Sequence, residues 1–342
     1  MRIGVLTGGG DCPGLNQAVR AVVMRGMDHG FELVGILRGW DGLVKGDTIP
    51  LGLAEVEDLV DKGGTVLESS RTNPFKEEAL LETTLKTIEA LRLDAICALG
   101  GEDTLGVASK LFDLGVKTVG IPKTMDNDID ETDYTFGYDS AVEVATEACD
   151  RLRDTARSHR RLMVLEVMGR HAGWVALASG VAGGADWILI PEVNLDLDEM
   201  CDHLTRVYER GKHFALIVAS EGVELPAAGG ETAERDAFGH VILRKRGVGE
   251  FIAKEVEERT PFEETRLSVL GHIIRGGAPS AFDRFLATRL GIKAMDLAKE
   301  GQFGMMSSIQ ANEIRGVWLR DAVDQLKRVP AELYAEIKTL FK

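Results

Sequence analysis

The chain has 342 residues, of which 44% are hydrophobic and 28% are charged, and its formal net charge is −15. This composition is typical of a soluble globular protein of about two domains, and the negative charge disfavours binding to nucleic acid or to an anionic membrane surface. No apolar segment approaches the ~20 residues of a membrane span, and the N-terminal MRIGVLT resembles a strand rather than a signal peptide.

Short apolar runs alternate with amphipathic helical patterns along the chain. The runs are continuous, as expected for parallel strands that are buried on both faces. The predicted strands are residues 3–6, 33–37, 95–99, 118–121, 162–167, 187–190, 214–219 and 267–274. Clear helical periodicity covers residues 16–27, 78–93 and 140–156. This alternation predicts an α/β fold with mainly parallel sheets.

Other features concern the connections and the cysteines. Asp139 or Ser140 is expected to cap the helix over residues 140–156. Residues 227–239 are expected to form a solvent-exposed loop, and the segment after about residue 310 shows helical patterns without a site-like motif. Because the four cysteines are far apart and form no C-x-x-C pair, we expect reduced thiols and a cytoplasmic protein.

Glycine-rich polar segments follow six of the predicted strands. In α/β sheets, ligands bind at the carboxyl ends of the strands, where such segments gather. The segments are TGGGDCPGLN, GGEDT, PKTMDND, MGRHAG, SEG and RGG. We expect them to form one composite site or two adjoining ones.

The segment TGGGDCPGLN, residues 7–16, leads from a strand into a helix. Glycines permit close approach of the backbone, and the N-terminus of a helix favours an anion, so the segment suits a phosphate group. It lacks both the G-x-G-x-x-G spacing and the Lys-Ser/Thr pair of a P-loop. A tight strand-to-helix turn is the alternative interpretation.

Two further segments combine opposite charges. Glu102 and Asp103 in GGEDT would repel phosphate unless Mg²⁺ lies between them, although acids at a helix N-terminus also complement its dipole. PKTMDND places Lys123, a cation suited to phosphate, beside Asp126 and Asp128, one of which can accept a proton while the other orients it. An Asx-rich turn is the alternative for this second segment.

Basic side chains are the remaining candidates for phosphate binding, because the guanidinium fork binds phosphate oxygens bidentately. Each one alone is also compatible with a solvated surface charge. Arg170 and Arg275 are favoured because they adjoin glycines at strand ends. The candidates are Arg71, Arg160, Arg161, Arg170, Arg266, His272 and Arg275.

Taken together, these motifs resemble the 6-phosphofructokinase family over roughly residues 1–300. The matching segments are TGGGDCPGLN, SSRTNPF, GGEDT, PKTMDNDI, EVMGRHAGW, SEG and TRLSVLGHIIRGGAPSAFDR. The resemblance implies two α/β sandwich domains with the active site in the cleft between them, and phosphoryl transfer to the 1-hydroxyl of fructose 6-phosphate. Residues 1–138 and about 255–305 are expected to bind the phosphoryl donor, and residues 139–254 and about 306–342 the sugar phosphate.

The resemblance also implies roles for individual residues. Asp126 matches the general base, Asp128 its supporting carboxylate, and Thr124 and Arg170 donors to the transferring phosphoryl group. The donor-binding residues are Gly10, Arg71, Asp103, Thr104 and Lys123, and Glu102 and Asp103 are the expected Mg²⁺ ligands. The sugar-phosphate residues are Arg161, Met168, Gly169, Arg170, Glu221, Arg266, His272 and Arg275. Arg161 and Arg266 match residues supplied by a neighbouring subunit, which implies a homodimer or homotetramer.

Two positions resemble the pyrophosphate-dependent members of the family. In ATP-using members the corresponding segments resemble GGDGS and PGTIDND. In this chain Asp103 stands in place of the last glycine of GGDGS, and Lys123 in place of the glycine of PGTIDND. An Asp there occupies the space of the ATP α-phosphate and repels it, and the lysine adds charge for compact pyrophosphate. We therefore expect pyrophosphate as the donor and a reversible reaction.

Departures from the family leave alternatives open. Glu102 replaces the usual Asp, so either acid could hold the metal, and Met24 replaces a basic effector residue while Arg20 is kept, so we expect weak or absent nucleotide regulation. The open alternatives are ATP as donor, sedoheptulose 7-phosphate as acceptor, and a non-catalytic sugar-phosphate sensor. The presence of Asp126 and Asp128 disfavours a sensor, which needs no base.

Overall fold

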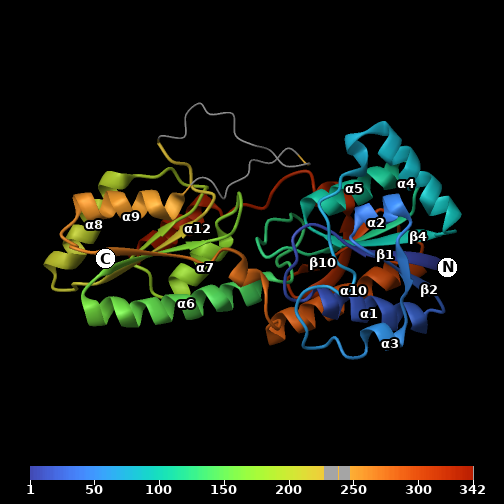
Figure 1. The fold of residues 1–342 in the computed structure, drawn as a ribbon, viewed down its shortest axis with the longest axis horizontal. Helices are drawn as coiled ribbons and strands as arrows, with labels where there is room; N and C mark the ends of the chain where they lie inside the picture. Colours follow the sequence, from blue (N-terminus) through green and yellow to red (C-terminus); the bar gives the residue numbers. More distant parts are fainter. Residues whose placement is uncertain (227–237, 239–246, 342) are drawn as a thin grey trace. The chain divides into compact units, whose positions relative to one another are not determined.

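The computed structural model describes residues 1–226, 238 and 247–341, and their contacts divide the chain into two compact units. Unit 1 contains residues 1–140 and 275–326 with residue 238, and unit 2 contains residues 141–226, 247–274 and 327–341 (Figure 1). The segment 227–239, predicted as a solvent loop, lies outside the described residues except for residue 238.

Unit 1 contains a seven-stranded sheet in the order β11-β10-β5-β4-β1-β2-β3. The five inner strands are parallel, and the two edge strands pair antiparallel with their neighbours. The strands are β1 (Arg2–Thr7), β2 (Glu32–Ile36), β3 (Thr48–Pro50), β4 (Ala95–Gly100), β5 (Thr118–Pro122), β10 (Met305–Gln310) and β11 (Glu313–Trp318). Because β1, β4 and β5 are adjacent and parallel, the segments that follow them meet at one edge of the sheet.

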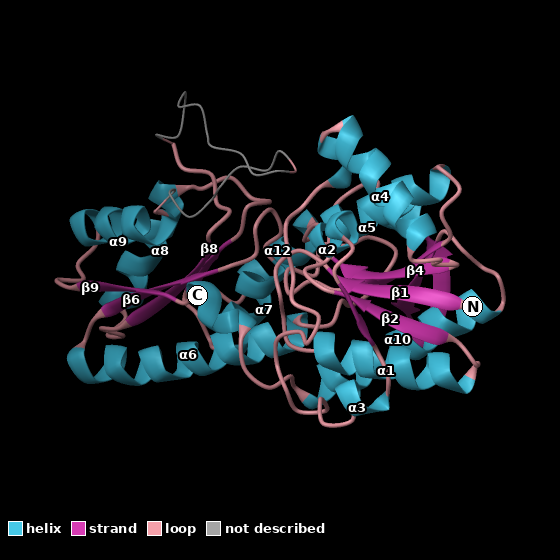
Figure 2. Ribbon diagram, turned by 45° about the vertical axis from the view of Figure 1, so that its right-hand side comes forward, coloured by secondary structure: helices cyan, strands magenta, loops and turns pink. Residues whose placement is uncertain are grey.

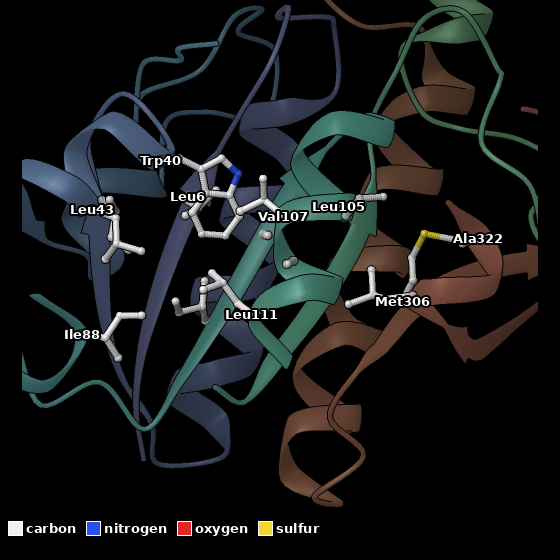
Figure 3. Packing of buried hydrophobic residues seen from close by; sticks show 14 of the residues in the cluster. Leu6, Trp40, Leu43, Ile88, Leu105, Val107, Leu111, Met306 and Ala322 are labelled. Atoms are coloured by element: carbon white, nitrogen blue, oxygen red, sulfur yellow. The ribbon is translucent and has the colours of Figure 1, made fainter. Parts of the chain in front are cut away.

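Helices cover both faces of this sheet. The helices α1 (Leu15–Asp28), α3 (Leu53–Val56) and α10 (Ala281–Lys299) lie on one face, and α2 (Trp40–Lys45), α4 (Glu78–Ala90) and α5 (Glu102–Asp113) on the other (Figure 2). The short elements are η1 (Pro74–Lys76) and α11 (Leu319–Ala322). Figure 3 shows the core under the second set of helices, where Leu105 and Leu111 of α5 pack with Trp40 and Met306.

Unit 2 has a smaller, wholly parallel sheet in the order β7-β8-β6-β9. Its strands are β6 (Leu162–Val167), β7 (Trp187–Leu189), β8 (Ala215–Ser220) and β9 (Thr265–Val269). The helices α6 (Tyr138–His159) and α7 (Trp174–Ala182) lie on one face, and α8 (Leu197–Glu209) and α9 (Val248–Arg259) on the other (Figure 2). The remaining elements are η3 (Gly271–Arg275) and α12 (Ala331–Lys338).

The predicted fold class is confirmed: both units are α/β sandwiches with mainly parallel sheets. The strand predicted over residues 267–274 is partly wrong, because β9 ends at Val269 and Gly271, at φ 49°, begins a 3₁₀ turn. The helical patterns predicted after about residue 310 correspond to α11 and α12, but the strand β11 in this segment was missed. The strand β10 was missed because the buried Ser307 and Ser308 interrupt its apolar run.

The division of the chain between the units differs from the expected one. Residues 255–274 belong to unit 2, because β9 pairs with β6, and residues 306–326 belong to unit 1, because β10 pairs with β5. The chain therefore crosses between units near Ile274, immediately before Arg275, and again near Leu326.

The predicted cap of α6 and the cysteines can also be compared with the structure. The helix begins at Tyr138, so that Asp139 and Ser140 lie in its first turn, and the backbone N–H of Ser140 donates to Asp283 of α10 (2.8 Å). All four cysteines are buried and unpaired. None of the described helices is long and apolar enough to cross a membrane.

Packing in unit 1 can be tested on two leucines at the end of α5. The side chain of Leu111 is fully buried, whereas Leu114 is 53% exposed. We expect Leu111→Ala to lower the free energy of unfolding by about 2–5 kcal/mol, because it removes apolar contacts and leaves a cavity. Leu114→Ala, as the matched control, should cost less than about 1 kcal/mol. Equal losses in urea denaturation would contradict this assignment of the core.

Candidate active site

The glycine loop between β1 and α1 is fastened to the segment 65–70. The Thr7 hydroxyl donates to the carbonyl of Glu68 (2.6 Å) and is hydrogen-bonded to the Thr65 hydroxyl (2.9 Å). The backbone N–H of Gly9 donates to the carbonyl of Ser70 (3.0 Å), and the Ser69 hydroxyl donates to the carbonyl of Gly9 (2.5 Å). These bonds place the backbone of the next residue, Arg71, beside the glycine loop, with its side chain exposed.

The turn from β4 into α5 packs against the same loop through Thr104. A Cβ atom at Gly100 would lie 2.2 Å from the Thr104 Cβ, and one at Gly8 would lie 2.5 Å from its Oγ1. The threonine is 2% exposed, so both glycines make room for it. This burial favours a role for Thr104 in holding the two turns together.

Glu102 and Asp103 form the first turn of α5 and are both half-buried. They complement the positive end of the helix dipole. Within residues 1–226, 238 and 247–341, no group of three or more acidic, His or Cys side chains could hold a metal. Two carboxylates nevertheless fit Mg²⁺, which keeps several waters and is commonly bound by one or two carboxylates together with substrate phosphates.

Lys123 links the end of β5 to the glycine loop. Its backbone N–H donates to the carbonyl of Gly100 (2.9 Å), and its Nζ donates to the carbonyl of Gly10 (2.5 Å). The side chain is 3% exposed, and this burial lowers the pKa of its ammonium group. The structure therefore brings Lys123 and Gly10, two predicted donor-binding residues, into direct contact.

The loop after Lys123 holds Asp126 and Asp128 in buried positions. The backbone N–H of Asp126 donates to the Thr124 hydroxyl (3.1 Å), and the Thr135 hydroxyl donates to the carbonyl of Thr124 (2.6 Å). The Oδ1 atom of Asp126 is buried and has no hydrogen-bond partner among the described residues. A buried carboxylate oxygen without a partner costs free energy unless a ligand supplies a donor, which favours a functional role.

Asn127 is a residue of this loop that the sequence interpretation missed. Its φ of 52° lies in the left-handed region, which Asn tolerates better than most residues. Its Oδ1 accepts the backbone N–H of Thr135 (3.0 Å), so this side chain fixes the turn between Asp126 and Asp128. An Asn between two acids in an Asx-rich turn is the signal that could have identified it.

Arg275 completes the cluster in unit 1. Its Nη1 donates to the carbonyl of Asp11 (3.1 Å), and the side chain is buried. A Cβ atom at Gly10 would lie 2.2 Å from this Nη1, so only glycine leaves room for the guanidinium. Gly10, Lys123 and Arg275 thus form a local positive centre in a chain of net charge −15.

In unit 2, the predicted sugar-phosphate residues gather at the ends of β6 and β8. Met168, Gly169 and Arg170 follow β6, and the backbone N–H of Glu221, after β8, donates to the carbonyl of Val167 (2.9 Å). The φ of Arg170 is 50°, and a Cβ atom at Gly222 would lie 1.8 Å from the Arg170 carbonyl oxygen. His272 lies in η3 after the neighbouring strand β9 and is exposed.

Arg161 and Arg266 lie at the opposite end of this sheet. Arg161 precedes β6, and Arg266 is the second residue of β9. Both form ion pairs with Glu264, Arg266 at 2.9 Å. The six residues of β6 separate them by about 20 Å from the segment that begins at Met168. The structure therefore brings these two arginines together but separates them from the other sugar-phosphate residues of unit 2.

Known proteins match this arrangement of motifs. A family profile described as phosphofructokinase matches residues 2–298. The chain belongs to the phosphofructokinase family. It is 52% identical, over the full length of both chains, to a pyrophosphate–fructose 6-phosphate 1-phosphotransferase of Amycolatopsis mediterranei. It is 47% identical, over 98% of each chain, to an ATP-dependent 6-phosphofructokinase of Streptomyces coelicolor.

The fold also matches a solved phosphofructokinase. The phosphofructokinase structure from Saccharomyces cerevisiae superimposes with a TM-score of 0.80 at 28% identity. That match covers 99% of this chain and 47% of the yeast chain, so the present chain spans about half of that protein.

Two glycines allow a test of the cluster in unit 1 of this phosphofructokinase. We expect Gly10→Ala to lower kcat/KM for the sugar phosphate at least tenfold, because the added methyl group would displace the Arg275 guanidinium. Gly106→Ala in α5 is the matched control, because a Cβ atom there meets nothing within 4 Å. A coupled enzyme assay measures both variants. Loss of activity in both, or in neither, would contradict the proposed packing.

Proposed function

We propose that this phosphofructokinase transfers a phosphoryl group from pyrophosphate to the 1-hydroxyl of fructose 6-phosphate, giving fructose 1,6-bisphosphate and phosphate, and that the reaction runs in both directions. The observation that carries the proposal is the position of Lys123, which is buried against the glycine loop. ATP-using members resemble PGTIDND in this segment and have a glycine in place of this lysine. The 52% identity to a pyrophosphate-dependent relative, against 47% to an ATP-dependent one, supports the same donor.

Proton transfer is assigned to Asp126. Its Oδ1 is buried and lacks a partner in the described structure, so it is available to accept the proton of the sugar 1-hydroxyl. Asp128, two residues further on and also buried, is assigned as the supporting carboxylate, and Asn127 fixes the turn between the two acids. The reverse reaction returns the proton from Asp126 to the sugar oxygen.

Charge neutralisation carries the phosphoryl transfer itself, because the transition state is loose and gains little from covalent help. Thr124 and Arg170 are assigned to the oxygens of the moving group, and Gly10 and Arg71 to the donor. Glu102 and Asp103 would hold Mg²⁺, which would supply further positive charge beside the donor phosphates. Lys123 adds a fixed positive charge at low dielectric, where electrostatic attraction is strong.

Selection of the donor follows from size and charge. Pyrophosphate needs no space beyond its second phosphorus, whereas ATP must place an α-phosphate and a nucleoside there. Asp103, half-buried in the first turn of α5, occupies that space and repels the α-phosphate. The four buried, unpaired cysteines favour the reducing cytoplasm as the location of the enzyme.

The sugar-phosphate site is assigned to residues from two subunits. Met168, Gly169, Arg170, Glu221, His272 and Arg275 are assigned to the chain's own site. Arg161 and Arg266 lie far from the other sugar-phosphate residues of unit 2, because the length of β6 separates them by about 20 Å. We assign these two arginines to the 6-phosphate bound by a neighbouring copy, which requires at least a homodimer.

The donor is tested first. With fructose 6-phosphate and Mg²⁺, a coupled assay should show turnover with pyrophosphate and little with ATP. The double variant Asp103→Gly/Lys123→Gly should lower the ratio of kcat/KM for pyrophosphate to that for ATP at least tenfold, because it removes both the repulsion of ATP and the added charge.

The matched control removes the same two charges elsewhere. Asp113 ends α5 and Lys117 precedes β5, and both are exposed, so Asp113→Gly/Lys117→Gly should leave the donor ratio unchanged. If the wild type turned over with ATP but not with pyrophosphate, the donor assignment would be wrong, although the family assignment would still hold.

Shared sites are tested by mixing two inactive variants. Asp126→Ser lacks the base, and Arg161→Ser lacks the arginine. In a purified heterodimer of the two, one site combines the intact Asp126 of one chain with the intact Arg161 of the other, so about half of wild-type activity should return. An inactive heterodimer would show that Arg161 serves its own chain.

The Asp126→Ser variant should still bind fructose 6-phosphate, and retained turnover in that variant would contradict the role of Asp126 as the base.

A further inference from the structure

Asp283 is a fully buried carboxylate to which the proposed mechanism assigns no role. It lies in the first turn of α10, at 0% exposure, with Ser280 as the N-cap of that helix. Burial raises the pKa of Asp283 to about 6, and hydrogen bonds from Ser140 act in the opposite direction. A buried acid of this kind costs free energy, so its presence requires a physical explanation.

The carboxylate joins the first turns of α6 and α10. Asp283 Oδ2 accepts both the backbone N–H of Ser140 (2.8 Å) and its hydroxyl (2.6 Å). The backbone N–H of Ser280 donates to the Ser140 hydroxyl (2.9 Å), and the backbone N–H of Asp283 donates to the Ser280 hydroxyl (3.1 Å). The Ser280 hydroxyl donates in turn to Asp139 (2.6 Å). Each helix therefore satisfies donors at the start of the other.

This network fixes two segments that contact the glycine loop. The segment 275–280 begins with Arg275, whose Nη1 donates to the carbonyl of Asp11 (3.1 Å). The segment 136–140 contacts Cys12, whose thiol donates to the carbonyl of Phe136 (3.5 Å). A Cβ atom at Gly137 would lie 2.4 Å from the Cys12 Sγ, so these chains are closely packed.

A short glycine-containing segment follows Arg275 in the chain. Its first three residues, Gly276, Gly277 and Ala278, are exposed, and Gly277 has a φ of 91°. Such a segment has high conformational freedom unless its end is fixed. The bonds among Ser280, Ser140 and Asp283 fix that end only five residues from the guanidinium.

We propose that Asp283 is a positioning residue, which holds Arg275 against the glycine loop by joining the segments 275–280 and 136–140. The effect of Asp283 on catalysis rests on the proposed function, in which Arg275 binds the sugar phosphate. The Oδ2 atom of Asp283 accepts both hydrogen bonds from Ser140, so an oxygen acceptor at this position is what holds the two segments together.

A double-mutant cycle tests the proposal. Arg275→Ala and Asp283→Ala should each raise KM for fructose 6-phosphate at least tenfold, and Asp283→Ala should change KM for pyrophosphate less than threefold. In the Arg275→Ala background, adding Asp283→Ala should raise KM by less than threefold, because Asp283 acts through Arg275. If the double variant raised KM by the product of the two single increases, the proposal would be overturned.

Two further variants separate positioning from general loss of structure. Asp283→Asn keeps an oxygen acceptor for Ser140, so its KM should lie within about threefold of the wild type. Leu290→Ala, on the same helix and fully buried, should lower the unfolding midpoint without changing KM. A rise in KM in the Leu290 variant would indicate a structural effect only. If Asp283→Ala does not fold, Ser140→Ala replaces it in the cycle with the same expectation.

A readout independent of catalysis separates this proposal from the proposed function. Cys12 is fully buried against the segment that Asp283 holds, and Cys97, Cys149 and Cys201 are buried elsewhere as internal controls. Thiol labelling followed by peptide mass analysis should show faster labelling of Cys12 alone in Asp283→Ala. Unchanged Cys12 labelling would overturn the proposal, whereas absent wild-type turnover with accelerated labelling would contradict only the proposed function.

Discussion

The hydrogen bond from the Lys123 ammonium to the carbonyl of Gly10 is the interaction on which the cluster in unit 1 depends. Burial of an ammonium group is costly unless polar groups surround it, and here the lowered pKa of Lys123 reflects that cost. In the proposed function this cost is offset when a multiply charged anion binds, because the anion would then meet a cation that water does not screen. Position 10 contributes in two ways: its backbone carbonyl accepts the hydrogen bond from Lys123, and the absence of a side chain makes room for Arg275.

The sheet of unit 1 explains how residues distant in sequence reach this interaction. Since β1, β4 and β5 are neighbours and parallel, their following turns lie at one edge, and Thr104, packed between Gly8 and Gly100, sets the distance between two of them. The segment 65–70 is then fastened to the glycine loop by bonds from Thr7 and Ser69. Positive charge is thereby concentrated locally in a chain whose overall charge of −15 would otherwise repel phosphates.

Much of this arrangement was predictable from the sequence, because continuous apolar runs identified the parallel strands and the glycine-rich segments marked their carboxyl ends. The strands β10 and β11 were less predictable. Buried Ser307 and Ser308 interrupt the apolar run of β10, and the antiparallel strand β11 has no buried residue. The supporting contacts were not predictable at all: the role of Asp283 depends on Ser140, 143 residues away, and no local pattern signals such a pair.

The position of Glu264 is compatible with the proposed division of a phosphate site between subunits. Two arginines held side by side repel each other, and the shared carboxylate of Glu264 offsets that repulsion while keeping both guanidinium groups at the start of β6 and β9. A phosphate carries more charge than one carboxylate and can bind both guanidinium groups at once, so it can displace Glu264 from the two arginines. Within one chain these arginines lie about 20 Å from the end of β6 at which its own sugar-phosphate residues gather, which is the reason for assigning them to a neighbouring copy. Assembly would then complete the site, and dissociation would remove the 6-phosphate contacts while leaving the donor cluster around Lys123 intact.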